Sequence, residues 1–243
     1  MLSFFNKKEE ENLFSLIKVD IHSHLLPKLD DGVNTFEESL IILEKMKKQG
    51  YQKVITTPHV MMGTYPNTYD GILEALQALR ARIRINKLDI IVEAAAEYHI
   101  DEGFIRKLEN EEKLLTFGDN YVLIETSFFN EPIYLRDVIF RLKAMDLKPI
   151  LAHPERYIYF QNNKRLLKDI IDLNILFQIN MNSLVGIYDK AAQKLAEWMV
   201  DNNHVNFLGT DCHNLKHIEH FEALSQNKFF KKAAKSGLLN STL

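Results

Sequence analysis

Short apolar runs alternate with amphipathic stretches along most of the chain. Runs rich in Val, Ile and Leu are typical of strands that are buried on both faces. Stretches between them carry helical spacing, as in the stripe formed by Ile72, Leu76, Leu79 and Ile83. The expected strands are residues 18–22, 53–57, 90–96, 121–124, 148–152, 175–179 and 205–209. Strands that alternate with helices predict a parallel sheet with crossover helices. Seven strands in 243 residues favour a closed or nearly closed α/β barrel.

Local signals place helices between the strands. Thr35 and Glu38 form a capping box, and Gly50 is the residue type that usually follows a helix, so a helix is expected over about 36–49. Further helices are expected at about 133–145, 164–172 and 188–201. The end of the chain is expected to be helical and then to fray. We divide the chain into a charged lead-in, residues 1–17, and a single barrel domain, residues 18–243.

Composition narrows the class of protein. Hydrophobic residues make up 46% of the chain, and 30 basic residues against 33 acidic ones give a formal net charge of −3. This balance does not favour binding to nucleic acid or to an anionic membrane. No apolar run approaches the roughly 18 residues that span a bilayer, and the first residues do not form a secretory signal. Cys212 is the only cysteine, so no disulfide can form within the chain. We therefore expect a cytoplasmic protein.

Residues with metal-binding side chains follow nearly every expected strand. His22 and His24 leave the first strand two residues apart, so their imidazoles lie on one side of it. Because all strand C-termini meet on one face of a parallel barrel, residues that are distant in sequence converge there. The residues at these positions are His22, His24, Asp31, His59, Glu97, Glu125, His153, Asn180, Asp211 and His213.

Each of these side chains alone has an ordinary explanation, such as a solvated carboxylate, a helix cap or a buried histidine. Together they occupy six of the seven strand ends, and carboxylates gathered in one cleft need a counter-charge, which metal ions supply. The nine candidates other than Asn180 exceed what one ion can use, so two or three ions are expected. Imidazole and carboxylate without thiolate suit Mn, Fe or Zn. Such centres activate water and clamp a phosphoryl group.

Arg156 follows His153 in the run His153-Pro-Glu-Arg-Tyr157. Its fork of donors could hold two phosphate oxygens beside the metals. The alternative is a surface ion pair with Glu155.

Several motifs carry a family resemblance that runs in register from Asp20 to Leu215. They are Asp20-Ile-His-Ser-His24, Asp30-Asp31-Gly32, Thr57-Pro-His59, Ala96-Glu97, Leu123-Ile-Glu125, Ala152-His-Pro-Glu-Arg-Tyr157, Ser183-Leu-Val-Gly186 and Asp211-Cys-His-Asn-Leu215. The chain resembles the polymerase-and-histidinol-phosphatase (PHP) superfamily. Within it, the chain resembles the bacterial capsular-polysaccharide tyrosine phosphatases of the CpsB/YwqE type.

The resemblance implies a distorted seven-stranded (β/α) barrel of the PHP type and three divalent metal ions, usually manganese. By motif position, one ion is held by His22, His24, Glu97 and Asp211, a second by Glu97, Glu125 and His153, and a third by Asp31, His59 and His213. Arg156 matches the family's arginine, and we expect Arg156, Asp211 and His213 to be catalytic. The implied substrate is phosphotyrosine on the tail of a bacterial tyrosine autokinase that controls exopolysaccharide and capsule synthesis.

The chain departs from some relatives at two places that bear on substrate contacts. Val60-Met61-Met62 follows His59 where some relatives carry basic residues, and Lys216 and His217 stand near a position where some carry arginine. The rim candidates that could pack on a phenyl ring, rather than simply against their own loops, are Met61, Met62, Tyr65, Phe128 and Phe129.

Three alternative functions are compared with the residues of this chain. A small-molecule phosphomonoesterase, such as a histidinol-phosphate phosphatase, would use the same metal site. A non-catalytic protein that binds a kinase tail is disfavoured because the ligand set is complete. A cysteine phosphatase that uses Cys212 is rejected, because residues 213–220 contain neither the arginine nor the glycine of a phosphate loop. The sequence leaves the oligomeric state open.

Overall fold

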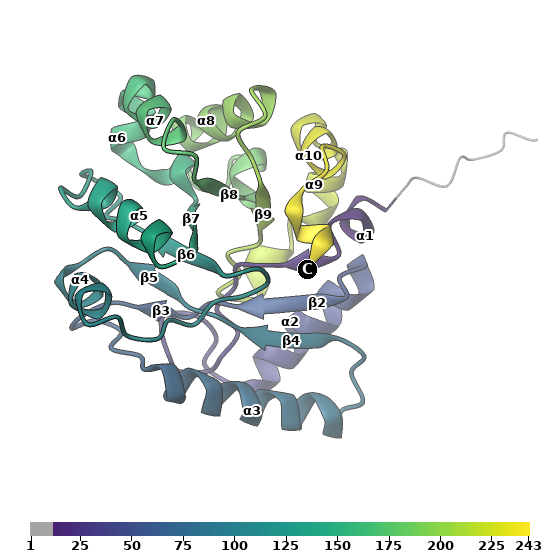
Figure 1. Ribbon diagram of the computed structural model, residues 1–243. Coiled ribbons are helices and arrows are strands. Elements are labelled where there is room, and N and C mark those ends of the chain that lie inside the picture. The colour runs from purple at the N-terminus through teal and green to yellow at the C-terminus, as the bar shows by residue number, and fades with distance from the viewer. Residues whose placement is uncertain (1–11) are drawn as a thin grey trace, which may run out of the picture.

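The computed structural model describes residues 12–243. Its strands are parallel and form two sheets, with the orders β1-β2-β4 and β3-β5-β6-β7-β8-β9. The strands are β1 (Val19–Asp20), β2 (Lys53–Thr56), β3 (His59–Val60), β4 (Ile91–Ala94), β5 (Glu97–His99), β6 (Tyr121–Glu125), β7 (Lys148–Ala152), β8 (Leu176–Asn180) and β9 (Phe207–Gly209). Figure 1 shows the strands in the middle of the molecule, with helices around them.

The two sheets belong to one barrel. The second expected strand is interrupted at Thr57-Pro58, so that β2 lies in one sheet and its continuation β3 in the other. The third is interrupted at Ala95-Ala96 in the same way, giving β4 and β5. On the far side, the last strand position meets the first through a bridge between Ser23 and Cys212. These breaks distort a barrel of seven strand positions, and the prediction of a distorted (β/α) barrel is confirmed.

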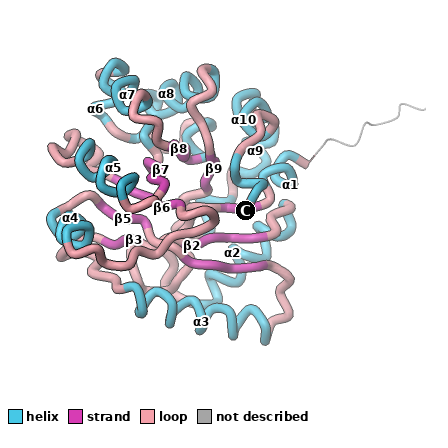
Figure 2. Tube along the Cα trace, viewed as in Figure 1, coloured by secondary structure: helices cyan, strands magenta, loops and turns pink. Residues whose placement is uncertain are grey.

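Helices cover the outside of the barrel (Figure 2). They are α1 (Leu13–Ile17), α2 (Phe36–Gln49), α3 (Tyr69–Ile85), α4 (Glu102–Glu109), α5 (Leu135–Ala144), α6 (Ile158–Asn162), α7 (Lys164–Ile171), α8 (Lys190–Asp201), α9 (Phe221–Gln226) and α10 (Lys228–Ala234). Half of the predicted capping box of α2 is present: the Thr35 hydroxyl accepts from the Glu38 backbone amide, whereas the Glu38 side chain accepts from the backbone amide of Asn34 and not of Thr35. The sequence analysis did not predict α4, whose N-cap is Asp101.

The end of the chain does not fray, so that expectation was wrong. The 3₁₀ turn η4 (Leu239–Thr242) lies against the start of the barrel, and Asn240 is fully buried there. The Asn240 amide donates to the carbonyls of Val19 and Leu208 and accepts from the Leu208 amide. An asparagine side chain that links the first and last strands explains why this segment is ordered.

The start of the described chain is also packed. In α1, which lies in the expected lead-in, Phe14 places its ring 4.8 Å from that of Phe221 and 5.0 Å from that of Phe230. Phe14 is therefore part of the core that α9 and α10 complete. Residues 1–11 of the lead-in lie outside the described residues.

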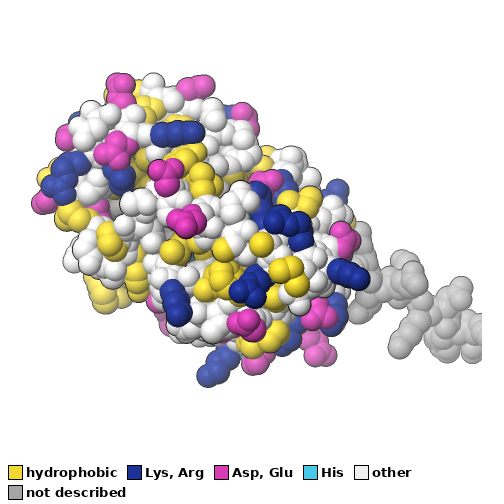
Figure 3. Space-filling model, turned by 90° about the horizontal axis from the view of Figure 1, so that it is seen from below, with side chains coloured by type: hydrophobic (Ala, Val, Ile, Leu, Met, Phe, Trp, Pro, Cys, Tyr) yellow, Lys and Arg dark blue, Asp and Glu magenta, His cyan; other side chains and the backbone are white. Residues whose placement is uncertain are grey.

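One face of the molecule shows no strong excess of one charge. On the face in Figure 3, seen from the side of α3, basic, acidic and hydrophobic side chains are mixed. No helix within residues 12–243 is long and apolar enough to cross a membrane.

Candidate metal centre

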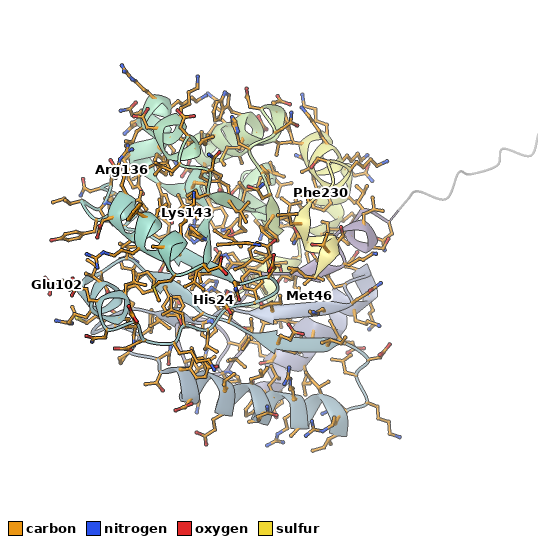
Figure 4. All side chains as sticks on the ribbon, viewed as in Figure 1. His24, Met46, Glu102, Arg136, Lys143 and Phe230 are labelled. Atoms are coloured by element: carbon orange, nitrogen blue, oxygen red, sulfur yellow. The ribbon has the colours of Figure 1, made fainter. Side chains whose placement is uncertain are left out.

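A cavity of about 600 Å³ opens at the carboxyl ends of the strands. Among its lining residues are seven of the predicted site residues, namely Asp31, His59, Glu125, His153, Arg156, Asp211 and His213. His22, His24 and Glu97 are fully buried and contact the lining side chains. Figure 4 shows His24 in the middle of the barrel, whereas Glu102 and Arg136 lie on the helices outside. The structure thus brings together every residue that the sequence analysis proposed for this site.

The deepest group contains two imidazoles and two carboxylates. His22 Nε2 lies 3.2 Å from Glu97 Oε2 and 3.4 Å from Asp211 Oδ1. His24 Nε2 lies 3.5 Å and 3.4 Å from the same two oxygens. Ligand atoms of His22, His24 and Asp211 all lie within 4.8 Å of one another, and Glu97 approaches both rings. This arrangement suits a single divalent ion.

A second group shares Glu97. His153 Nε2 lies 3.0 Å from Glu97 Oε1 and 3.9 Å from Glu125 Oε2. His59 Nδ1 lies 3.1 Å from both Glu97 Oε2 and Glu125 Oε1. Glu97 Oε2 faces both groups and Oε1 faces His153, so this carboxylate could contribute to both sites.

The third group lies nearest to solvent. Asp31 Oδ1 is 3.5 Å from both His59 Nε2 and His213 Nε2. Ligand atoms of Asp31, His59, His213 and His24 all lie within 4.8 Å of one another. His59 contributes to this group and also to the second one. The family motifs had assigned His59 to the third ion alone.

The charges in the centre balance one another. Burial alone would lower the pKa of His22, but Glu97 and Asp211 raise it to about 10. Burial likewise opposes the shift at His59, where Glu97 and Glu125 raise the pKa to about 12. Burial would raise the pKa of Asp211, yet His22 and His213 hold it well below its ordinary value. Protons on the imidazoles thus compensate the carboxylates, which is the role that divalent cations would take.

Several buried polar atoms support the fit to metal ions. Among residues 12–243, His59 Nδ1, Glu97 Oε2 and His153 Nδ1 are buried without a hydrogen-bond partner. Orphaned buried polar atoms are rare in folded proteins and need an explanation. The first two are 3.1 Å apart but form no hydrogen bond with each other, so one bound cation could satisfy both.

Neighbouring residues orient the histidines. Asp30 Oδ2 accepts from His24 Nδ1 at 2.7 Å and from the His59 amide at 2.9 Å. The carbonyl of Asp211 accepts from Nδ1 of both His213 and His217 at 2.9 Å. Bonds of this kind keep Nε2 free to bind a metal. The sequence analysis missed Asp30, whose only signal was its place beside Asp31.

Two of the site residues have left-handed backbone conformations. His153 has φ of 32° and Asp211 has φ of 49°. Such conformations are uncommon for residues other than glycine and gather at functional sites. His153 directly follows β7 and Asp211 is the second residue after β9, and both side chains line the cavity.

Arg156 points into the cavity. Its Nη1 donates to Asp211 Oδ2 at 2.9 Å, and its guanidinium lies 4.6 Å from the ring centroid of Phe128 and 4.2 Å from that of Tyr188. The Glu155 carboxylate instead accepts from the backbone amide of Asn180 and from the Ser183 hydroxyl. The alternative of a surface pair between Arg156 and Glu155 is therefore wrong.

Cys212 lies between two site residues but is fully buried, and its thiol contacts the carbonyl of Asn214. Burial raises its pKa well above the ordinary value, so the thiolate is disfavoured. This environment agrees with the rejection of a cysteine nucleophile.

The cavity has an aromatic rim. Of the five rim candidates, Met61, Tyr65, Phe128 and Phe129 line the cavity, whereas Met62 lines a neighbouring groove beside Arg106. His99 and His217 also line the cavity, and Lys216 is exposed outside it. His99 Nδ1 lies 3.3 Å from Glu125 Oε1, a contact that the sequence analysis did not foresee.

A parallel barrel with clustered imidazoles and carboxylates at its strand ends defines a protein of the barrel-type metallohydrolase class. A family model described as capsular polysaccharide synthesis, CpsB/CapC, matches residues 18–234. The chain belongs to the CpsB/CapC family.

Relatives agree with this assignment. The tyrosine-protein phosphatase YwqE of Bacillus subtilis is 31% identical over 199 residues, which cover 82% of this chain and 78% of YwqE. The putative tyrosine-protein phosphatase CapC of Staphylococcus aureus is 30% identical over 197 residues, which cover 81% of this chain and 77% of CapC.

Solved structures agree as well. A chain from the crystal structures of YwqE from Bacillus subtilis and CpsB from Streptococcus pneumoniae, described as unique metal-dependent tyrosine phosphatases, superposes with a TM-score of 0.79. It is 28% identical, and the match covers 93% of this chain and 96% of that one. A phosphotriesterase homology protein from Escherichia coli, 14% identical with a TM-score of 0.52, covers 91% of this chain and 92% of its own and shares the fold.

Proposed function

We propose that this protein is a metal-dependent protein-tyrosine phosphatase. The observation that carries the proposal is the convergence of five imidazoles and four carboxylates beside Arg156, in one cavity at the strand ends. The family and the names of its relatives support the same activity. The proposed unit is a single barrel domain over residues 18–243, with α1 packed against it.

The proposed ligand sets follow the three groups of side chains. His22, His24, Glu97 and Asp211 would hold one ion, Glu97, Glu125 and His153 a second, and Asp31, His59 and His213 a third. Mn is the proposed metal, and Fe or Zn would fit the same donors. When bound, such ions lower the pKa of water and neutralise charge on a phosphoryl group.

Arg156 is proposed to grip the phosphate. The two aromatic rings and Asp211 fix its guanidinium at the cavity wall, so its remaining donors are pre-positioned for phosphate oxygens. Asp211 contacts Arg156 and belongs to the deepest group, and His213 contacts Asp211 and belongs to the outermost group. These two residues would therefore align both the metals and the reacting phosphate.

The phenyl ring of a phosphotyrosine substrate is proposed to lie at the rim of the cavity. Tyr65 and Phe129 lie on its rim, where they could pack on a phenyl ring. Tyrosine leaves with a pKa of about 10, so it needs less help from a general acid than a serine alkoxide would. We propose that the natural substrate is the phosphotyrosine tail of a bacterial tyrosine autokinase that controls exopolysaccharide and capsule synthesis, and that the protein acts in the cytoplasm.

Matched phosphopeptides test this function. Peptides that differ only in carrying phosphotyrosine, phosphoserine or phosphothreonine are compared in the manganese-loaded protein, alongside histidinol phosphate. A strong preference for phosphotyrosine is expected, with complete loss after exhaustive chelation and recovery with manganese. Full activity without metal, or higher efficiency on histidinol phosphate, would refute the proposal. Binding of the phosphotyrosine peptide without turnover would instead indicate a non-catalytic binding protein.

A further inference from the structure

Strand β8 carries two amide side chains that connect separate parts of the centre. Gln178 Oε1 lies 2.7 Å from His22 Nδ1, and Gln178 Nε2 donates to Asn180 Oδ1 at 2.8 Å. Asn180 Nδ2 then donates to Asp211 Oδ2 at 2.6 Å. The two amides are buried and lie on the same side of the strand, because they are two residues apart. They form an unbroken chain of hydrogen bonds from Asp211 to His22.

The direction of every bond in this chain follows from Asp211. An ionised carboxylate can only accept hydrogen bonds, so Asn180 must turn its NH₂ group toward it. The oxygen of Asn180 then faces Gln178, which must offer its own NH₂ group in return. The oxygen of Gln178 is left to face His22, and Nδ1 of that ring must carry a proton.

A proton held on Nδ1 leaves Nε2 of His22 as the nitrogen that can bind a metal. Nε2 is also the atom that faces Glu97 and Asp211, at 3.2 and 3.4 Å. Asp30 and the carbonyl of Asp211 achieve the same end for His24 and His213 by direct contact. For His22, two side-chain amides lie between the carboxylate and the ring, and their hydrogen bonds fix the position of the proton.

Gly209 on β9 makes room for this chain. A Cβ atom built at Gly209 would lie 2.8 Å from Gln178 Nε2 and 2.8 Å from His22 Cβ. Both contacts are too close for a real side chain, so any larger residue must displace the amide or the histidine. Gly209 does not have a positive φ, so its backbone conformation alone does not demand glycine. The space is needed by the hydrogen-bonded pair.

We propose that Gln178 and Asn180 are positioning residues: Asp211 sets the direction of their hydrogen bonds, and these bonds fix the His22 ring in its metal-binding tautomer. The inference rests on the proposed function, because it assumes that His22 binds a metal. Strand β8 supplies none of the nine proposed ligands. Under this proposal, its two amide side chains nevertheless strengthen metal binding. Losing an outer hydrogen-bond partner of a metal-bound histidine typically weakens metal binding by about 10- to 100-fold.

Zinc titration by calorimetry of the chelator-stripped full chain tests the proposal, together with ¹⁵N NMR of the histidine rings in the zinc-loaded protein. Gln178→Met removes the acceptor for His22, and Gly209→Ala displaces it without removing it. Both should weaken the tightest zinc site by about 10- to 100-fold. The matched control is Gln161→Met, which removes a hydrogen bond from a glutamine side chain to the carbonyl of Glu155. This bond lies outside the hydrogen-bond chain from Asp211 to His22, so the variant should bind zinc as the wild type does.

Two outcomes would overturn the inference alone: unchanged zinc affinity in folded Gln178→Met, or a His22 ring with an unprotonated Nδ1 in the zinc-loaded wild type. The NMR measurement uses only the wild type, so the inference stays falsifiable if a variant fails to fold. A wild type that binds no zinc or manganese would refute the proposed function itself, and the two failures are therefore distinguishable.

Discussion

Arg156 offers the most direct test of how the cavity holds phosphate. Its side chain is held on three sides, by the Asp211 carboxylate and by the rings of Phe128 and Tyr188. A guanidinium held in this way loses little conformational freedom when a phosphate arrives. Its contribution to binding should therefore be close to the full value of a charge-assisted hydrogen bond.

Arg156→Ala removes that interaction. A hydrogen bond to a charged group contributes roughly 1.5–3 kcal/mol, and about 1.4 kcal/mol corresponds to a tenfold change in rate. The expected loss in kcat/KM on a phosphotyrosine peptide is thus about 10- to 150-fold. Metal content should not change, because Asp211 keeps its bond to Asn180.

The assay compares kcat/KM and metal content of the wild type, Arg156→Ala and Arg156→Lys. Lysine keeps the charge but loses the planar fork and the stacking, so its activity should be intermediate. Arg136→Ala, on the outer surface of α5 (Figure 4), is the control and should behave as the wild type. Unaltered kinetics in Arg156→Ala would refute the assignment of Arg156 to the phosphate.

Three further variants test other parts of the structure. Cys212→Ser should keep most of the phosphatase activity, because the buried thiol has a pKa well above its ordinary value; complete loss of turnover with metals still bound would contradict this. Asn240→Ala should lower the free energy of unfolding in urea by about 3 kcal/mol, because it leaves buried strand groups without partners. The exposed Asn202→Ala is its control and should change stability little. Phe129→Ala should raise KM for a phosphotyrosine peptide more than for a small alkyl phosphate, and equal effects on both substrates would argue against stacking on the phenyl ring.

The convergence of the candidate site could be predicted because it depends on two simple regularities. Strands of a parallel barrel end on one face, and residues such as Glu97 and His153 directly follow apolar runs. Neither regularity requires knowledge of how a particular loop is folded. The seven strand positions followed from the same pattern.

Other features depended on contacts that a sequence pattern does not contain. Asp30 and Asp31 are adjacent carboxylates in one turn, and only the backbone conformation decides which of them holds His24. Gln178 is a polar residue inside an apolar strand, a visible signal, but its partner His22 comes from the first strand position, which the closure of the barrel brings next to β9. The fraying expected at the C-terminus failed because Asn240 finds strand backbone groups that are distant in sequence.

The closure of the barrel has a consequence for synthesis of the protein. The amide of Thr210 bonds to Asp20 across 190 residues, and the Asp211 amide bonds to the carbonyl of His22. A ribosome adds about 5–20 residues per second, so β9 is synthesised about 10–40 s after β1. During that interval the apolar side chains and free strand edge of β1 are open to aggregation, and His22 and His24 lack Asp211. The candidate centre can therefore assemble completely only after Asp211 has been synthesised, about 190 residues after the first strand.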